Sequence, residues 1–300
     1  MKYVFNILIA FVVIWIVWTV IDRGPRHAET EVSEAGAAKD FDGAQLVKSC
    51  SGCFRRPFAV EYCNDEMFVA NDIAGRDGKD STGFVCRTSL YGEFVDNLHI
   101  ADLKSPKGMA VNDGCLYIAD LNRIVKYDID GDSIAAILSI DGAKNLSDIE
   151  KDRSGLLYVS DSQDAKIYRI KNDTVTLFAS DTLLNGVSGL AYYDGCIFAG
   201  ANKRIVRVDA SGRVKIFAHV VYPVCGLCAD DNGCFITTDF VGNVYVVSNG
   251  PQQLLVKRRQ GVNSAIVGYI PEQKLLAVPT FANNSVEIYE IGRYLQQYNK

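Results

Sequence analysis

Histidine and tryptophan are scarce in this sequence, with three and two copies in 300 residues. The shortage of imidazole groups limits histidine-based metal binding and acid–base catalysis. An excess of positive charge is also missing, because 31 Lys and Arg face 36 Asp and Glu and leave a net charge of −5. Proteins that bind nucleic acid usually carry a basic patch, so nucleic acid is not an expected partner. Hydrophobic residues make up 48% of the chain, which excludes a disordered protein.

Long helical periodicity is missing after Ile21, and an internal repeat takes its place. A large apolar residue within a short apolar run recurs at intervals of roughly 40 residues. These residues are Phe68, Tyr117, Tyr158, Phe198, Phe235 and Leu276. One unit therefore occurs six times within residues 41–300.

Each copy contains four short runs that are typical of β-strands. In the second copy we expect strands over residues 108–112, 115–119, 124–128 and 134–140. The dipeptides Asp113-Gly114 and Asp194-Gly195 lie between the first two runs of their copies, and such pairs favour tight hairpins. Four antiparallel strands per unit are typical of a propeller blade, so six units predict an all-β, six-bladed β-propeller.

The sixth copy contains only three expected strands, over residues 264–270, 274–278 and 285–291. Residues 43–49 resemble the fourth run of the fifth copy. We therefore expect this segment to pair as the outer strand of blade six, with Leu46 and Val47 as its apolar cover. Closure by an N-terminal strand would remove the open edge that an incomplete ring presents.

Residues 4–21 form an apolar run that would measure about 27 Å as a helix, close to the ~30 Å core of a bilayer. A cleaved signal peptide is the alternative, but the first cluster of small residues, at 35–38, lies far beyond the run. We expect residues 1–21 to be an N-terminal stub and transmembrane anchor (4–21) and residues 22–40 to be a linker. The propeller (41–300) would lie on the periplasmic or luminal/extracellular side of this single-pass membrane protein.

Nine cysteines is a high and odd number for this chain. In an oxidising compartment, at least one thiol would stay free or pair with another chain. Cys50 and Cys53 have C-x-x-C spacing, but the histidine needed for haem attachment does not follow them. Cys225 and Cys228 have the same spacing within a predicted strand. Packing in the core is the interpretation for most of the nine.

The second copy contains Pro106-Lys107-Gly108 and Tyr117-Ile118-Ala119-Asp120, and in these motifs it resembles an NHL repeat. Residues 41–300 as a whole resemble the NHL and gluconolactonase/strictosidine-synthase-like group of six-bladed propellers. The resemblance implies the fold and leaves the activity open, because the group contains lactonases, lyases and binding scaffolds.

The expected topology brings one set of side chains to a mouth of the central channel. Some lie where innermost strands begin and others where second strands end. The candidate ligand-binding residues are Lys107, Asp120, Asp148, Asp161, Ser188 and Asp239. Several carboxylates there would suit Ca²⁺ or another divalent cation. The alternative is that Asp120 and Asp161 cap their own loops through hydrogen bonds to the backbone. Lys107 and Asp148 begin adjacent blades, so we expect an ion pair between them.

The lactonases of this group are expected to have a Glu, an Asn and an Asp at three blade entrances. At the matching positions this chain has Arg55, Ser188 and Cys225. Metal-assisted hydrolysis would lose its Lewis acid and its base, which is evidence against a lactonase. We therefore expect no cofactor and a membrane-tethered binding or scaffold module for a protein or small-molecule ligand at the channel mouth. The alternative is a hydrolase or lyase of the gluconolactonase-like group with a non-standard divalent-cation site.

Overall fold

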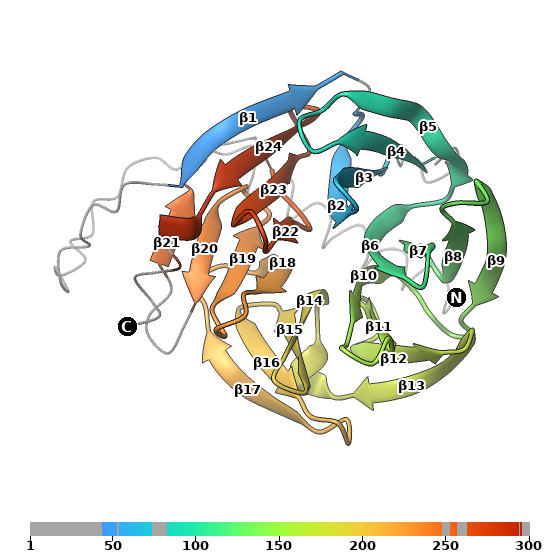
Figure 1. Cartoon of the computed structure of the whole chain (residues 1–300). Helices are drawn as coiled ribbons and strands as arrows, with labels where there is room; N and C mark the ends of the chain where they lie inside the picture. The colour runs from blue at the N-terminus through green and yellow to red at the C-terminus, as the bar shows by residue number, and fades with distance from the viewer. Residues whose placement is uncertain are drawn as a thin grey trace, which may run out of the picture. The chain divides into compact units, whose positions relative to one another are not determined.

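The structure is a computed structural model that describes residues 44–52, 54–73, 83–247, 253–256, 263–293 and 295. These residues form six four-stranded antiparallel sheets, arranged as a ring around a central channel (Figure 1). The predicted all-β, six-bladed propeller is confirmed.

In each of the first three blades, the strands follow their sequence order from the channel outward. Blade 1 consists of β2 (Pro57–Cys63), β3 (Glu66–Asn71), β4 (Gly83–Ser89) and β5 (Phe94–Leu103). Blade 2 consists of β6 (Pro106–Asn112), β7 (Cys115–Asp120), β8 (Arg123–Asp128) and β9 (Ser133–Ser139). Blade 3 consists of β10 (Leu146–Lys151), β11 (Leu157–Asp161), β12 (Lys166–Lys171) and β13 (Thr174–Ser180).

Two of the remaining blades follow the same order, and the last takes its outer strand from the other end of the chain. A short 3₁₀ helix, η1 (Thr182–Leu184), leads into blade 4, which consists of β14 (Val187–Tyr193), β15 (Cys196–Ala201), β16 (Arg204–Val208) and β17 (Val214–His219). Blade 5 consists of β18 (Val224–Ala229), β19 (Phe235–Asp239), β20 (Val244–Val247) and β21 (Gln253–Val256). Blade 6 consists of β22 (Gly268–Ile270), β23 (Leu275–Thr280), β24 (Ser285–Glu290) and β1 (Gln45–Ser51).

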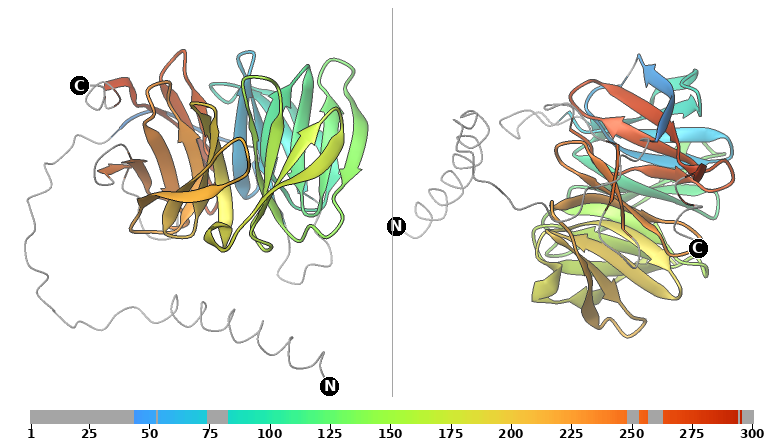
Figure 2. Two further views of the ribbon diagram at one scale, coloured as in Figure 1. Left: turned by 90° about the horizontal axis from the view of Figure 1, so that it is seen from below. Right: turned by 90° about the vertical axis from the view of Figure 1, so that its left-hand side faces the viewer.

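The innermost strands run in the same direction around the channel. Equivalent residues of neighbouring blades lie side by side, as Ser147 and Ser188 do, and a parallel bridge joins Ala59 to Ile266. We call the end where these strands begin the entry end and the other the exit end; Figure 2 shows the ring from the side. Every loop can thus be assigned to one end.

Glycine lets the innermost strands approach one another closely. We number each innermost strand from the residue that pairs with the last residue of the second strand, which is Pro106 in blade 2 and Val187 in blade 4. Gly108 and Gly189 then occupy the third position. A Cβ atom at Gly189 would come within 2.4 Å of the backbone nitrogen of Leu227, and one at Gly108 within 2.2 Å of the Asp148 carboxylate. A side chain at either position would therefore push two blades apart.

The ring closes as the sequence predicts, with a shift of two residues. β1 pairs antiparallel with β24, from Gln45 opposite Glu290 to Ser51 opposite Ser285. The expected apolar cover was wrong, because Leu46 and Val47 are 50% and 47% exposed.

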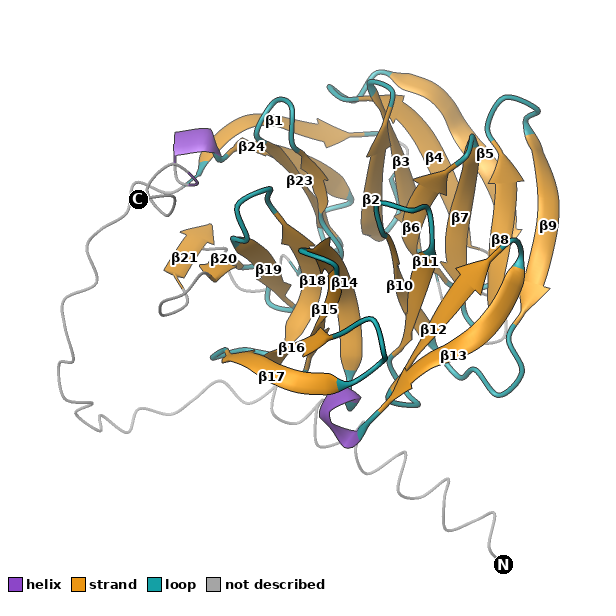
Figure 3. Cartoon of the chain, turned by 60° about the horizontal axis from the view of Figure 1, so that its bottom comes forward, coloured by secondary structure: helices purple, strands orange, loops and turns teal. Residues whose placement is uncertain are grey.

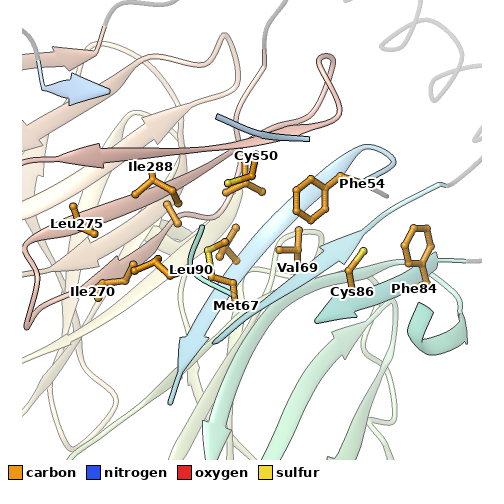
Figure 4. Packing of buried hydrophobic residues seen from close by; sticks show 13 residues of the cluster. Cys50, Phe54, Met67, Val69, Phe84, Cys86, Leu90, Ile270, Leu275 and Ile288 are labelled. Carbon is orange, nitrogen blue, oxygen red and sulfur yellow. The ribbon is translucent and has the colours of Figure 1, made fainter. Parts of the chain in front are cut away.

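The inward contact of β1 comes instead from Cys50, which is 3% exposed. It packs with Met67, Val69 and Ile288 in a core cluster between blades 6 and 1 (Figure 4). The closure strand therefore joins the hydrophobic core through its second half. The eight described cysteines are free thiols, and Cys53 lies outside the described residues.

The expected anchor (4–21) and linker (22–40) also lie outside the described residues. Within the part of the chain that the structure describes, no helix has the length and apolar character needed to cross a membrane.

Candidate functional site in the central channel

The aspartates at the entry end bind the loops of their own blades. Asp120 accepts hydrogen bonds from the Ser105 backbone N–H (2.7 Å) and from Arg123 Nε (2.7 Å). Asp161 accepts from the backbone N–H groups of Lys144 (2.8 Å) and Asn145 (3.0 Å). Both carboxylates have no exposed surface. The capping alternative thus describes what these two side chains do.

Asp239 has the same kind of surroundings in blade 5. Its carboxylate accepts hydrogen bonds from the backbone N–H groups of Gly242 (2.9 Å) and Asn243 (3.0 Å) and from the hydroxyl of Tyr245 (2.8 Å). With 2% exposure, it is occupied within its own turn. Among the described residues, no group of three or more His, Cys, Asp or Glu side chains has a geometry that would hold a metal ion.

Lys107 does not form the expected ion pair with Asp148. Its ammonium group donates to the Asn145 side-chain oxygen at 2.5 Å and lies 5.9 Å from the centre of the Phe58 ring. Burial lowers the pKa of Lys107 from its usual value, while the charges of Asp72, Asp161 and Asp120 act in the opposite direction. Lys107 is thus a buried amine at the entry end, held by a neutral amide.

Asp148 does not lie at the entry mouth, and this corrects the sequence alignment. The register shows Ser147 at the level of Lys107 and Ser188, and the Ser147 and Ser188 hydroxyls are 3.0 Å apart. Asp148 takes the next position, where blades 2, 4 and 5 have glycine. Its carboxylate accepts hydrogen bonds from the backbone N–H groups of Ile149 (2.9 Å) and, across the blade boundary, Leu190 (2.8 Å). Asp148 therefore points along the channel wall towards blade 4.

Figure 3 shows the innermost strands side by side around the centre of the ring. A cavity of about 250 Å³ in the exit half of the channel is lined by residues of all six of these strands or of the segments that lead into them. We call it the exit cavity. Its lining includes a ring of six apolar side chains, one from the fourth position of each innermost strand, and each is 5% exposed or less. They are Val60, Met109, Ile149, Leu190, Leu227 and Val267. No residue of the entry mouth lines the cavity, whereas the exit-end residues Tyr62, Tyr269 and Pro271 do.

Three carboxyl groups line this cavity: Asp148, Glu61 and Glu150. One Glu61 oxygen accepts a hydrogen bond from the Val111 backbone N–H (3.0 Å), and Glu150 accepts one from the N–H of Lys151 (2.9 Å). In the described part of the chain, none of the three carboxyls forms an ion pair with Lys, Arg or His. The ammonium group of Lys151 donates to the Val111 carbonyl at 2.6 Å instead.

The surroundings raise the pKa values of all three acids above their usual range. Burial raises the pKa of Glu61 to about 7 and that of Asp148 to about 8, and the charge of Glu61 adds to the effect on Asp148. Burial and the neighbouring Asp148 raise the pKa of Glu150 to about 8. Burial has this effect because a charge removed from water is costly; the charge of Lys151 acts in the opposite direction on Glu61 and Glu150.

Glu61 and Glu150 were missed by the sequence analysis, although the repeat contained a signal for them. Both occupy the fifth position of an innermost strand, where the other blades have Ala, Cys or Gly. A charged residue in a strand that is otherwise apolar or small marks a channel-lining site. Cys228, at the same position in blade 5, also lines the cavity, and burial raises the pKa of its thiol.

The sequence matches none of the known family models and none of the curated proteins it was compared with. Solved structures do match the fold. The chain resembles a streptogramin B lyase with 13% identity and a TM-score of 0.59, covering 83% of this chain and 96% of that one. A putative gluconolactonase matches with 15% identity and a TM-score of 0.60, covering 85% and 96%.

A gluconolactonase from Xanthomonas campestris matches with 14% identity and a TM-score of 0.57, covering 84% of this chain and 95% of that one. The chain is a six-bladed propeller that resembles these lyases and gluconolactonases. At such low identity the likeness concerns the fold alone, and function has to be argued from the site.

Proposed function

We propose that the protein is a binding module that takes a small cationic molecule into the exit cavity of its propeller. In this proposal, residues 4–21 tether the propeller to a membrane. One observation supports the proposal: three carboxyl groups line one cavity and form no ion pair with a Lys, Arg or His among the described residues. The ligand would supply the missing positive charge.

The energetics support a cation. Two opposite charges about 4 Å apart attract with roughly 4 kcal/mol at the effective dielectric constant of a protein surface, and more where water is excluded. A bound cation would therefore lower the pKa values of Glu61, Asp148 and Glu150 and release their protons. A neutral molecule would gain none of this attraction, and an anion would be repelled by any carboxylate that ionises.

The lining favours an organic cation over a metal ion. The ring of six apolar side chains offers contacts to carbon and none to a hydrated ion. Tyr62, Tyr192 and Tyr269 also line the cavity, and aromatic rings attract ammonium groups. The hydroxyl oxygen of Tyr269 is buried and has no hydrogen-bond partner within the described structure. An alkylammonium ion would combine a charged head for the carboxyls with a tail for the ring.

The proposal is tested by titrating the full-length protein with three probes of equal chain length: butylammonium, butan-1-ol and butyrate. We expect butylammonium to bind at least about tenfold more tightly than the alcohol, which corresponds to about 1.4 kcal/mol, and butyrate to bind weakest. Equal binding of all three would contradict a cation site, and binding of none would contradict the cavity as a ligand site.

Two matched variants connect the binding to the cavity. Glu150→Gln removes one carboxyl from the cavity and keeps its shape, so butylammonium affinity should fall while butan-1-ol affinity stays the same. Glu93→Gln makes the same change on an exposed turn between β4 and β5 and should leave both unchanged. An equal loss in both variants would mean that the general negative field of the protein attracts the probe.

The second candidate function is a hydrolase or lyase with a non-standard divalent-cation site. The acidic cavity is the observation in its favour, since Ca²⁺ takes carboxylate oxygens as ligands. A calcium titration separates the candidates. Tight stoichiometric Ca²⁺ binding that is lost in Asp148→Ala would favour the enzyme, and binding of butylammonium without Ca²⁺ would favour the binding module.

A further inference from the structure

Two neighbouring loops at the entry end of blade 5 expose four large apolar side chains. Val221 and Tyr222, between β17 and β18, are 62% and 46% exposed. Phe240 and Val241, between β19 and β20, are 54% and 46% exposed. We call these four residues the apolar rim. Single exposed apolar residues are ordinary, but a contiguous group of them is typical of an interaction surface.

The fold presents the apolar rim as one surface. Val224 at the start of β18 pairs with Asp239 at the end of β19, so the loop before β18 and the turn after β19 lie side by side. The Tyr222 ring stacks on Tyr245 of β20, with ring centres 6.0 Å apart and an angle of 23° between the planes. The Asp239 carboxylate holds the turn that carries Phe240 and Val241 through its bonds to Gly242 and Asn243.

Basic side chains flank the apolar rim on the adjacent blade. Lys203 and Arg204 lie at the β15–β16 turn of blade 4, and His219 at the end of β17 is the cross-strand partner of Arg204. The Lys203 carbonyl accepts a hydrogen bond from Val220, which directly precedes the rim (3.1 Å). Asp239, the acidic residue between the two loops, is buried and satisfied. The surface therefore combines apolar tips with exposed positive charge.

We propose that the apolar rim docks onto the surface of a membrane that contains anionic lipids. Aliphatic and aromatic tips beside Lys and Arg are the composition that enters the headgroup region of an anionic bilayer. We infer an anionic membrane as the partner because basic side chains flank the apolar rim and because the same chain contains the apolar run 4–21. The inference stands apart from the cation-binding proposal, because the rim and the exit cavity lie at opposite ends of the channel.

The chain is long enough for this contact. Residues 22–44 are 23 residues, which can span at most about 76–83 Å when fully extended, whereas a strand of seven residues is about 23 Å long. β1 begins at the exit end, since Gln45 is the partner of Glu290. In the proposed docking, the entry end faces the bilayer. The exit cavity would then open away from the membrane.

The test uses a fragment of residues 39–300, so that the apolar run 4–21 contributes nothing. Residues 41–300 form one compact unit, and the ring closes from Gln45 onwards. The fragment is sedimented with vesicles of phosphatidylcholine alone and with vesicles that also contain phosphatidylserine. We expect binding to the anionic vesicles, at least about tenfold weaker binding to the neutral ones, and a loss of binding at high salt.

Matched variants connect the binding to the rim. Phe240→Ser combined with Val241→Ser should lower vesicle binding by about tenfold or more. Ile134→Ser combined with Ile137→Ser removes two equally exposed side chains from β9 (50% and 49%) and should not change it. Tyr222→Ser alone is the second rim variant and should lower binding if the double variant melts early. No binding of the unmodified fragment, or an equal loss in the β9 control, would overturn the proposal.

Discussion

The two ends of the channel use the same acidic residue types in opposite ways. At the entry end, Asp120, Asp161 and Asp239 are surrounded by N–H and O–H donors of nearby loops. At the exit end, Glu61 and Glu150 each accept one backbone hydrogen bond and face a cavity. The first group holds the loops of its own blades, whereas burial raises the pKa values of the second group, for which we propose a cationic ligand. Residue type alone therefore does not identify a ligand site; the supply of donors does.

Removing β1 should have the largest effect, because it opens the ring on which both ends depend. A chain that begins at residue 54 loses the ladder to β24 and the buried Cys50 side chain. With six residue pairs between β1 and β24 and roughly 0.5–1.5 kcal/mol per hydrogen bond, we expect a loss of about 3–9 kcal/mol of unfolding free energy. Urea denaturation of chains that start at residues 39 and 54 measures it, and equal stability would refute the closure.

Asp239→Ala tests whether a carboxylate at the entry end stabilises the fold without taking part in cation binding. The substitution leaves the Gly242 and Asn243 N–H groups and the Tyr245 hydroxyl without their acceptor. We expect a loss of about 2–4 kcal/mol of stability and unchanged binding of butylammonium, because buried donors left unpaired are costly. Denaturation together with a titration of the same preparation tests both parts. A stable variant that no longer binds the cation would reverse the assignment of the two ends.

The pH dependence of stability tests the raised pKa values of the carboxyls in the exit cavity. Carboxyls whose pKa is raised on folding stabilise the protein below their unfolded pKa values, near 4, and lose this contribution as the pH rises through 7 to 8. The unfolding free energy should thus fall between about pH 5 and pH 9.

Glu150→Gln should make that fall smaller, by at least about 1 kcal/mol, because Gln carries no proton to lose. Guanidinium denaturation midpoints at pH 5 and pH 9 measure the difference. The control Glu93→Gln should keep the full slope. A slope that is the same in all three proteins would show that the exit carboxyls are ionised already.

The fold could be predicted from the sequence because each blade repeats its own local signals. Turn pairs such as Asp113-Gly114 and the recurring apolar residue at Tyr117 and Tyr158 determine strand positions without reference to other blades. Closure was predictable for the same reason, since one copy lacked a strand. The orientation of Leu46 and Val47 could not be predicted, because the irregular register of β1 between Leu46 and Lys48 changes which residues face the core.

The site was harder because its position depends on irregularities within the blades. Five of the six innermost strands (β2, β6, β10, β14 and β18) begin with a register shift, and in β10 this shift lies between Leu146 and Ile149. Counting along the sequence placed Asp148 at the level of Lys107, while the structure places Ser147 there. The entry-end aspartates attracted attention because they repeat. Glu61 and Glu150 are exceptions to the repeat, and it is the exceptions that line the exit cavity.

The most direct test of the account is the number of protons released when a cation binds. Butylammonium is titrated into the full-length protein at pH 7 by calorimetry, in two buffers with different heats of ionisation. The difference between the two binding heats, divided by the difference between the ionisation heats of the buffers, gives the number of protons released. If Glu61, Asp148 and Glu150 lose protons when the ligand binds, this number should be about one or more per bound cation. Identical heats in the two buffers would show that no carboxyl changes its charge, and this would contradict the proposed role of the exit cavity.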